Sequence, residues 1–163
     1  MSSCSRRTVL AALALAPLSA CGFTPVYAPG GGGEILRRSF IVEPPTTRLG
    51  FALVSRIEAR LGRVEAPAYV LTYDISTSTS GLAITGADDV TRINIDGVVR
   101  YQVNRIGTDE VVESGQVTTF VAYSQTGTPI ATVAARRDAE DRLMITLADQ
   151  MVSRLLSSAP SWT

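Results

Sequence analysis

Cys21 is the residue whose type and position point most directly to chemistry. It lies in the run Leu-Ser-Ala-Cys-Gly at residues 18–22, after a start with arginines at 6–7 and an apolar stretch over 9–16. A basic start, a short apolar stretch and small residues before a cysteine are typical of a bacterial lipoprotein signal peptide. The apolar stretch is far shorter than the roughly 20 residues of a membrane-spanning helix. We predict that residues 1–20 are a signal peptide, removed before Cys21.

The chemistry expected at Cys21 is acylation, with diacylglycerol on the thiol and a third acyl chain, typically palmitate, on the new amino group. At about 0.8 kcal/mol per buried methylene, several chains give a stable membrane anchor. We predict no cofactor beyond this covalent lipid. The less favoured alternative is an ordinary secretory signal peptide. Residues 5–10, Ser-Arg-Arg-Thr-Val-Leu, also resemble a twin-arginine motif, so the general and the twin-arginine export routes both stay open.

Composition excludes several kinds of active site. The chain contains 15 Arg but no Lys and no His, and Cys4 would leave with the signal peptide. The usual base of a catalytic triad, the commonest metal ligand and free thiols are therefore missing. All cationic recognition falls to Arg, whose planar fork suits carboxylate and phosphate.

Two groups of carboxylates remain as candidates for acid–base chemistry or metal binding: Asp88 with Asp89, and Asp138 with Glu140 and Asp141. The first group has the composition of a turn and the second that of a solvated helix face. We therefore expect no enzymatic activity, no metal site and no nucleic-acid partner.

The helices and strands that would carry these residues are predicted from the Pro and Gly residues that interrupt them and from hydrophobic periodicity. Residues 21–34, rich in Pro and Gly, are expected to form a flexible tether. Its Phe23, Val26 and Tyr27 would lie at the lipid interface or against a partner, unless the segment is simply a spacer. Residues 35–158 are expected to form one domain, followed by a C-terminal tail at 159–163.

Within the domain, two periodicities alternate along the chain. Apolar residues every four positions, after an N-cap at Thr46 or Thr47, predict a helix that ends at Gly62. Period-2 alternation predicts strands, and Thr128 followed by Pro129 opens a final helix. The predicted strands are 39–43, 69–76 with a polar arm continuing to 84, 91–104 and 111–123; the final helix runs to about 157.

This β-α-β-β-β-α order predicts an α+β two-layer sandwich. A four-stranded, mainly antiparallel sheet would carry two helices on one face, because the links between the last three strands are too short for crossover helices. The other face would be left open and polar. Phe120 lies on that polar face, which suggests that it is partly covered.

Both ends of the chain resemble the LPS-assembly lipoprotein family LptE, in its alphaproteobacterial form. Residues 21–27, Cys-Gly-Phe-Thr-Pro-Val-Tyr, are close to the family's Cys-Gly-Phe-x-Pro-Leu-Tyr start, with Val26 in place of Leu. The Ala- and Arg-rich stretch 132–149 is similar to the family's last helix. The element order agrees over almost all of residues 21–158.

The resemblance implies a non-enzymatic lipoprotein on the periplasmic side of the outer membrane. It would sit within the lumen of the β-barrel protein LptD, and the two would place lipopolysaccharide in the outer leaflet. Gly22 fits this location, since Asp after the lipidated Cys usually retains a lipoprotein in the inner membrane. The alternative is an auxiliary lipoprotein of a lipid-transporting ABC system.

Lipopolysaccharide carries phosphates, and without Lys any direct contact must come from Arg. Arg56 and Arg60, on the first helix, have the positions of solvated or i,i+4-paired residues. The candidate ligand-binding residues are Arg92, Arg100, Arg105, Arg136 and Arg137, with Arg92 the first choice because it follows the Asp88-Asp89 turn. The alternative for each is a solvated surface charge.

Overall fold

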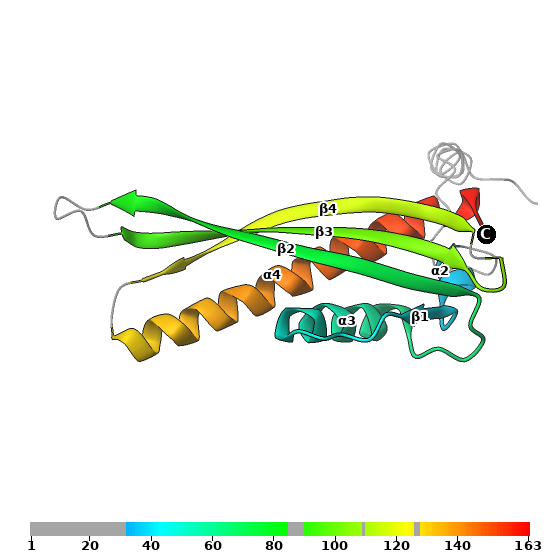
Figure 1. The fold of residues 1–163 in the computed structure, drawn as a ribbon, viewed down its shortest axis with the longest axis horizontal. Helices are drawn as coiled ribbons and strands as arrows, with labels where there is room; N and C mark the ends of the chain where they lie inside the picture. The colour runs from blue at the N-terminus through cyan, green and yellow to red at the C-terminus, as the bar shows by residue number, and fades with distance from the viewer. Residues whose placement is uncertain (1–31, 85–89, 109, 126–127) are drawn as a thin grey trace, which may run out of the picture.

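The fold is organised by a four-stranded mixed sheet with strand order β1-β2-β3-β4 (Figure 1). The structure, a computed structural model, describes residues 32–84, 90–108, 110–125 and 128–163. Cys21, most of the expected tether and the Asp88-Asp89 pair lie outside these residues. The strands are β1 (Phe40–Val42), β2 (Tyr69–Ile84), β3 (Val90–Arg105) and β4 (Val111–Ser124), and the helices are α2 (Gly32–Leu36), α3 (Arg48–Leu61), α4 (Pro129–Ser158) and the short η1 (Ala159–Ser161).

The strand pairing confirms the predicted α+β architecture. β1 runs parallel to β2, whereas β2, β3 and β4 are antiparallel neighbours. The polar run Ser-Thr-Ser-Thr-Ser at 76–80 continues β2, as predicted, so that β2 and β3 each span 16 residues. Figure 1 shows both strands reaching the end of the molecule where α4 begins, and there sheet and helix diverge.

Local capping sets the start of both long helices. Thr47 accepts a hydrogen bond from the Gly50 amide (3.1 Å), and Thr128 accepts one from the Ala131 amide (3.3 Å). Pro129 occupies the first turn of α4, where its missing N–H leaves no bond unmade. α3 ends at Gly62, whose φ of 84° favours glycine.

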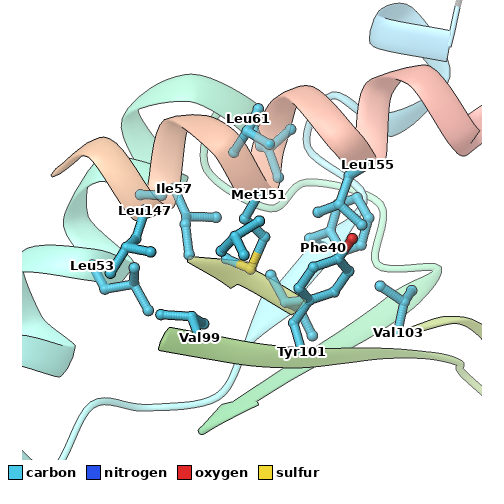
Figure 2. Close-up of a cluster of buried hydrophobic side chains, with 14 of the residues drawn as sticks. Phe40, Leu53, Ile57, Leu61, Val99, Tyr101, Val103, Leu147, Met151 and Leu155 are labelled. Carbon is cyan, nitrogen blue, oxygen red and sulfur yellow. The ribbon is translucent and has the colours of Figure 1, made fainter. Parts of the chain in front are cut away.

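The core lies between the sheet and the two long helices (Figure 2). The odd-numbered face of β3 points inward as predicted, with Ile95, Val99, Tyr101 and Val103 all buried. Leu53, Ile57 and Leu61 from α3 and Leu147, Met151 and Leu155 from α4 close over it. At 1.5 Å per residue the 30-residue α4 is about 45 Å long. Residues 129–138 contain no buried side chain, so this end of α4 overhangs the core.

Both ends of the described chain are more ordered than the sequence suggests. Residues 32–34, expected as tether, begin α2. Trp162, expected in a tail, is only 9% exposed and stands edge-on to Tyr69, with ring centroids 5.1 Å apart, and to Phe40. The expected tail therefore contributes to the core, because burying an indole ring between two other rings is favourable.

Candidate functional site

The two long helices pack on one face of the sheet and leave its other face open. Even-numbered residues of β3 point to it because alternate side chains of a strand take opposite faces. In the middle of the face, Arg100 lies between Asp74 of β2 and Gln116 of β4. Two rows further, Asp96 lies between Ser78 and the 66% exposed Phe120. No described part of the chain covers Phe120, so the partial cover that its position suggested is absent from this part of the protein.

Short side-chain hydrogen bonds fix polar groups along β3. The Asn94 amide donates to Asp96 Oδ1 (2.9 Å), and the Gln102 amide donates to Asn104 Oδ1 (3.0 Å). Asn94 is 7% exposed, and its Oδ1 has no partner among the described residues. These hydrogen bonds hold polar side chains of β3 in place, and Asn94 Oδ1 is an acceptor without a partner among the described residues.

Arg92 and Arg100 both lie on this face and are exposed. They stand eight residues apart on one strand, which at about 3.3 Å per residue separates them by about 26 Å. Among the described residues neither side chain has an ion pair or a hydrogen bond. No described residue engages either guanidinium group, and at this separation the two cannot hold the same phosphate.

Arg105 lies apart from them, at the opposite end of β3 from Arg92. It donates to the Trp162 carbonyl oxygen (2.9 Å), and its guanidinium carbon lies 5.6 Å from the Tyr69 ring centroid. Its Nε is 3.8 Å from a Glu110 carboxylate oxygen. Through these contacts Arg105 holds Trp162 against β2 and β3.

Arg136 and Arg137 lie on the overhanging end of α4. Arg136 donates to Glu140 (2.9 Å) in an i,i+4 pair, and Glu140 also accepts from Arg48 of α3. Arg137 has no ion pair among the described residues. Arg136 and Arg137 are sequence neighbours on α4, whereas Arg100 and Arg105 belong to β3.

The carboxylates on α4 are engaged in ion pairs. Asp138 pairs with Arg142, and Asp141 with Arg48. Asp149 accepts from both Arg56 (2.9 and 3.0 Å) and Arg60 (3.1 Å), so these two arginines link α3 to α4 and are not paired within their own helix. No group of three or more potential metal ligands occurs among the described residues.

Sequence reasoning missed an apolar stripe on the first turns of α4. Ile130 is 84% exposed and Val133 51% exposed, and with Pro129, Ala134 and Arg137 they line a hollow of about 370 Å³. The signal was present, since positions 130, 133, 134 and 137 have the i, i+3, i+4, i+7 spacing of one helix face. Arg137 therefore stands at the edge of an apolar surface.

Two tyrosines on the covered face of the sheet have perturbed acidity. Burial raises the pKa of the Tyr101 hydroxyl; Glu113 raises it further, and Arg154 opposes the shift. Burial, followed by the charge of Glu43, raises the pKa of Tyr73. Both phenols are neutral near pH 7, so they act as packing groups and not as bases.

Comparison with protein-family models finds a match to LptE, described as lipopolysaccharide-assembly, over residues 38–155. A comparison with curated protein sequences finds no match. No helix among the described residues is long and apolar enough to cross a membrane.

Several solved structures are similar in fold. A candidate lipoprotein from Caulobacter crescentus CB15 aligns with a TM-score of 0.66 at 18% identity, covering 79% of this chain and 96% of that one. The rare lipoprotein B from Shewanella oneidensis gives 0.59 at 16% identity, with 76% and 96% covered. A minor lipoprotein from Acinetobacter baumannii gives 0.56 at 16% identity, with 76% and 92% covered. At these identities the similarity establishes the fold.

Proposed function

The chain belongs to the LptE lipopolysaccharide-assembly family, and we propose that it acts as a lipid-anchored outer-membrane subunit that partners an LptD-like β-barrel. In this role it would help to place lipopolysaccharide in the outer leaflet, from the periplasmic side of the membrane. The anchor would be the N-acyl and S-diacylglycerol groups on Cys21. The observation that carries the proposal is the family match over residues 38–155, which spans the sheet and both long helices.

The open sheet face supports a plug-like association with a barrel. Its rows combine Ser, Thr, Asp, Arg and Gln side chains, which suit the polar interior of an outer-membrane barrel. The projecting ends of β2 and β3 extend this surface lengthwise. Phe120 supplies an exposed aromatic group that a partner would cover.

Direct contact with lipopolysaccharide is proposed for the unpaired arginines. Arg92 and Arg100 are exposed and available for charge-assisted hydrogen bonds to phosphate. Arg137 stands beside the apolar stripe, an arrangement that suits an amphiphile with phosphate and acyl groups close together. Arg105 and Arg136 already have partners within the chain and would have to exchange them.

We propose a non-enzymatic role. The carboxylates on α4 that could have served as acid and base are neutralised by arginines, which is the arrangement of a structural ion-pair network. Assembly of a lipid into a leaflet requires binding and release, and the exposed polar and apolar surfaces described above provide for binding.

Affinity capture of the full-length, acylated protein from solubilised envelopes tests this proposal. We expect an outer-membrane β-barrel protein and lipopolysaccharide to be recovered with it. Recovery of an inner-membrane ATPase complex without a barrel would instead support the auxiliary role in lipid-transporting ABC systems. The Cys21→Ala variant is the control for the anchor: it should lack acyl chains and fractionate less with the outer membrane.

A further inference from the structure

The two outer edges of the sheet differ in length and in protection. β1 has three residues and is followed directly by Glu43, Pro44 and Pro45. A short strand, a charge and prolines are common ways in which a sheet edge avoids pairing with another chain. β4, the other edge, has 14 residues and pairs only with β3 among the described residues (Figure 1). β4 is therefore the edge that can accept another strand.

The sequence of β4 lacks the protection found after β1. Residues 114–125 contain no charged residue and no proline. The stretch 117–123, Val-Thr-Thr-Phe-Val-Ala-Tyr, is rich in β-branched and aromatic residues, which favour strands. The register with β3 continues without a bulge from Glu113 to Ser124. A long, regular and neutral edge of this composition is the kind that pairs with another strand.

Two hydrogen bonds show which backbone groups of β4 point outward. The Thr72 hydroxyl of β2 donates to the Gln102 carbonyl oxygen (3.4 Å), so even-numbered backbone groups of β3 turn toward β2. On the other side of the sheet, the Arg154 guanidinium of α4 donates to the Gln116 carbonyl oxygen (2.7 Å). Because backbone groups of an antiparallel strand alternate between its two edges, the even-numbered residues of β4 point away from β3.

Beyond Gln116 these outward groups have no partner. The amide and carbonyl groups concerned belong to Thr118, Phe120 and Ala122, and no described residue forms a hydrogen bond with them. The Phe120 side chain is 66% exposed. An open hollow of about 580 Å³ adjoins Thr118, with residues 150, 153 and 154 of α4 on its other side. The edge therefore offers unpaired backbone groups, an exposed ring and space beside them.

We propose that two copies of this chain pair through their β4 edges, antiparallel and about a two-fold axis at Phe120. Thr118 of each copy would face Ala122 of the other, and each facing pair would exchange both of its backbone hydrogen bonds. The two Phe120 rings would lie side by side on the open face and cover each other. The two four-stranded sheets would then form one continuous sheet.

A second copy suits this edge because it brings a strand of the same neutral, β-rich sequence, so that no like charges meet at the axis. Pairing of one edge with itself closes after two copies, whereas pairing of β4 with the β1 edge of the next copy would continue as a fibre. The short β1 and the prolines after it oppose the fibre. Arg154, which occupies the Gln116 carbonyl oxygen, limits the pairing to the residues beyond it.

The dimer should be weak and reversible. Pairing over five residues buries well under the roughly 1,000 Å² of a stable interface. The acyl anchor proposed above would favour the dimer, because it would confine both copies to one membrane and raise their effective concentration. The barrel proposed above would also cover Phe120, so the dimer is the state of subunits that have not met a barrel.

Sedimentation equilibrium of the purified full-length protein in detergent tests the pairing. The unsubstituted protein should pass from monomer to dimer as its concentration rises. Thr118→Pro removes one outward N–H and no bond to β3, so it should raise the dissociation constant of the dimer at least tenfold. Thr118→Ala, which keeps the N–H, is the matched control and should change the constant less than threefold. Melting temperatures followed by circular dichroism should be the same in both variants.

A second pair of variants keeps the backbone intact. Phe120→Glu would bring two carboxylates together at the axis and should also raise the dissociation constant at least tenfold. Ser114→Glu, at an exposed position outside the paired residues, is its control and should dimerise normally. A protein that stays monomeric, or a dimer that both Thr118→Pro and Phe120→Glu leave intact, would overturn the proposal.

Hydrogen exchange locates the contact within the dimer. The amides of Thr118, Phe120 and Ala122 should exchange at least threefold more slowly well above the dissociation constant than below it, and the Ser114 amide should not change. Protection of these amides only in a complex with a barrel protein would overturn the proposal and assign the edge to the barrel. Loss of the dimer would leave the capture of a barrel by the unsubstituted protein unaffected, so the two proposals fail separately.

Discussion

The hydroxyl of Tyr101 lies directly over Gly115: a Cβ atom on residue 115 would stand 2.6 Å from the Tyr101 hydroxyl oxygen and 2.7 Å from its Cζ. The two residues face each other across β3 and β4, and Tyr101 is 4% exposed. A side chain at 115 is therefore excluded by a rigid, buried ring.

Replacing Gly115 by Ala should destabilise the fold by about 1–3 kcal/mol, the usual cost of overpacking a core. Urea unfolding followed by circular dichroism measures this change. The neighbouring Ser114→Ala, at an exposed position, is the control and should change stability by less than about 0.5 kcal/mol. Equal stabilities of the two variants would show that Tyr101 can move aside freely.

An Asp substitution should destabilise the protein on the buried face of β4 and leave its stability nearly unchanged on the open face. Val117 is fully buried, whereas Thr118 lies on the open face. Val117→Asp should cost several kcal/mol, because it buries a carboxylate without a partner, and Thr118→Asp should leave the melting temperature nearly unchanged. A larger loss in Thr118→Asp would mean that the open face is covered in the folded protein.

The alternation of strand residues predicted these faces because the period of a strand is fixed by its geometry. The positions of Arg92 and Arg100 on the open face, and their separation, also follow from residue number alone. The contact of Arg105 with Trp162 could not be predicted, since it joins residues 57 apart through tertiary packing. Likewise, nothing in the Ala-Pro-Ser sequence of residues 159–161 signals that Trp162 completes the aromatic cluster with Phe40 and Tyr69.

The free energy of unfolding should fall in strong alkali, where the buried Tyr101 hydroxyl loses its proton. Its pKa is raised in the folded state, mainly by burial, above the ordinary value of about 10. The folded protein thus holds this proton more tightly than the unfolded chain. The resulting stabilisation is complete below about pH 10 and is lost as the pH rises through the folded-state pKa.

Urea unfolding at about pH 8 and about pH 11 tests this expectation. The free energy of unfolding should fall more in the unsubstituted protein than in Tyr101→Phe, which has no proton to lose at this position. If Tyr101→Phe loses as much stability as the unsubstituted protein, the alkaline loss has another origin.

Arg92→Ala and Arg100→Ala should each weaken binding of the full-length protein to lipopolysaccharide by about threefold to tenfold. This is the expected effect of losing one charge-assisted hydrogen bond at an exposed site. The effect should shrink at high salt, because exposed charges are screened. Arg142→Ala, at an exposed arginine already paired with Asp138, is the control and should bind normally. Unchanged binding in an Arg92, Arg100 double variant would exclude these residues from the ligand site.

The most direct test of the account is the transport of newly made lipopolysaccharide in cells depleted of this protein. We predict that labelled lipopolysaccharide fails to reach the outer leaflet and accumulates inside the envelope, and that the full-length chain restores its transport. Normal arrival of lipopolysaccharide at the cell surface after complete depletion would contradict the proposed function.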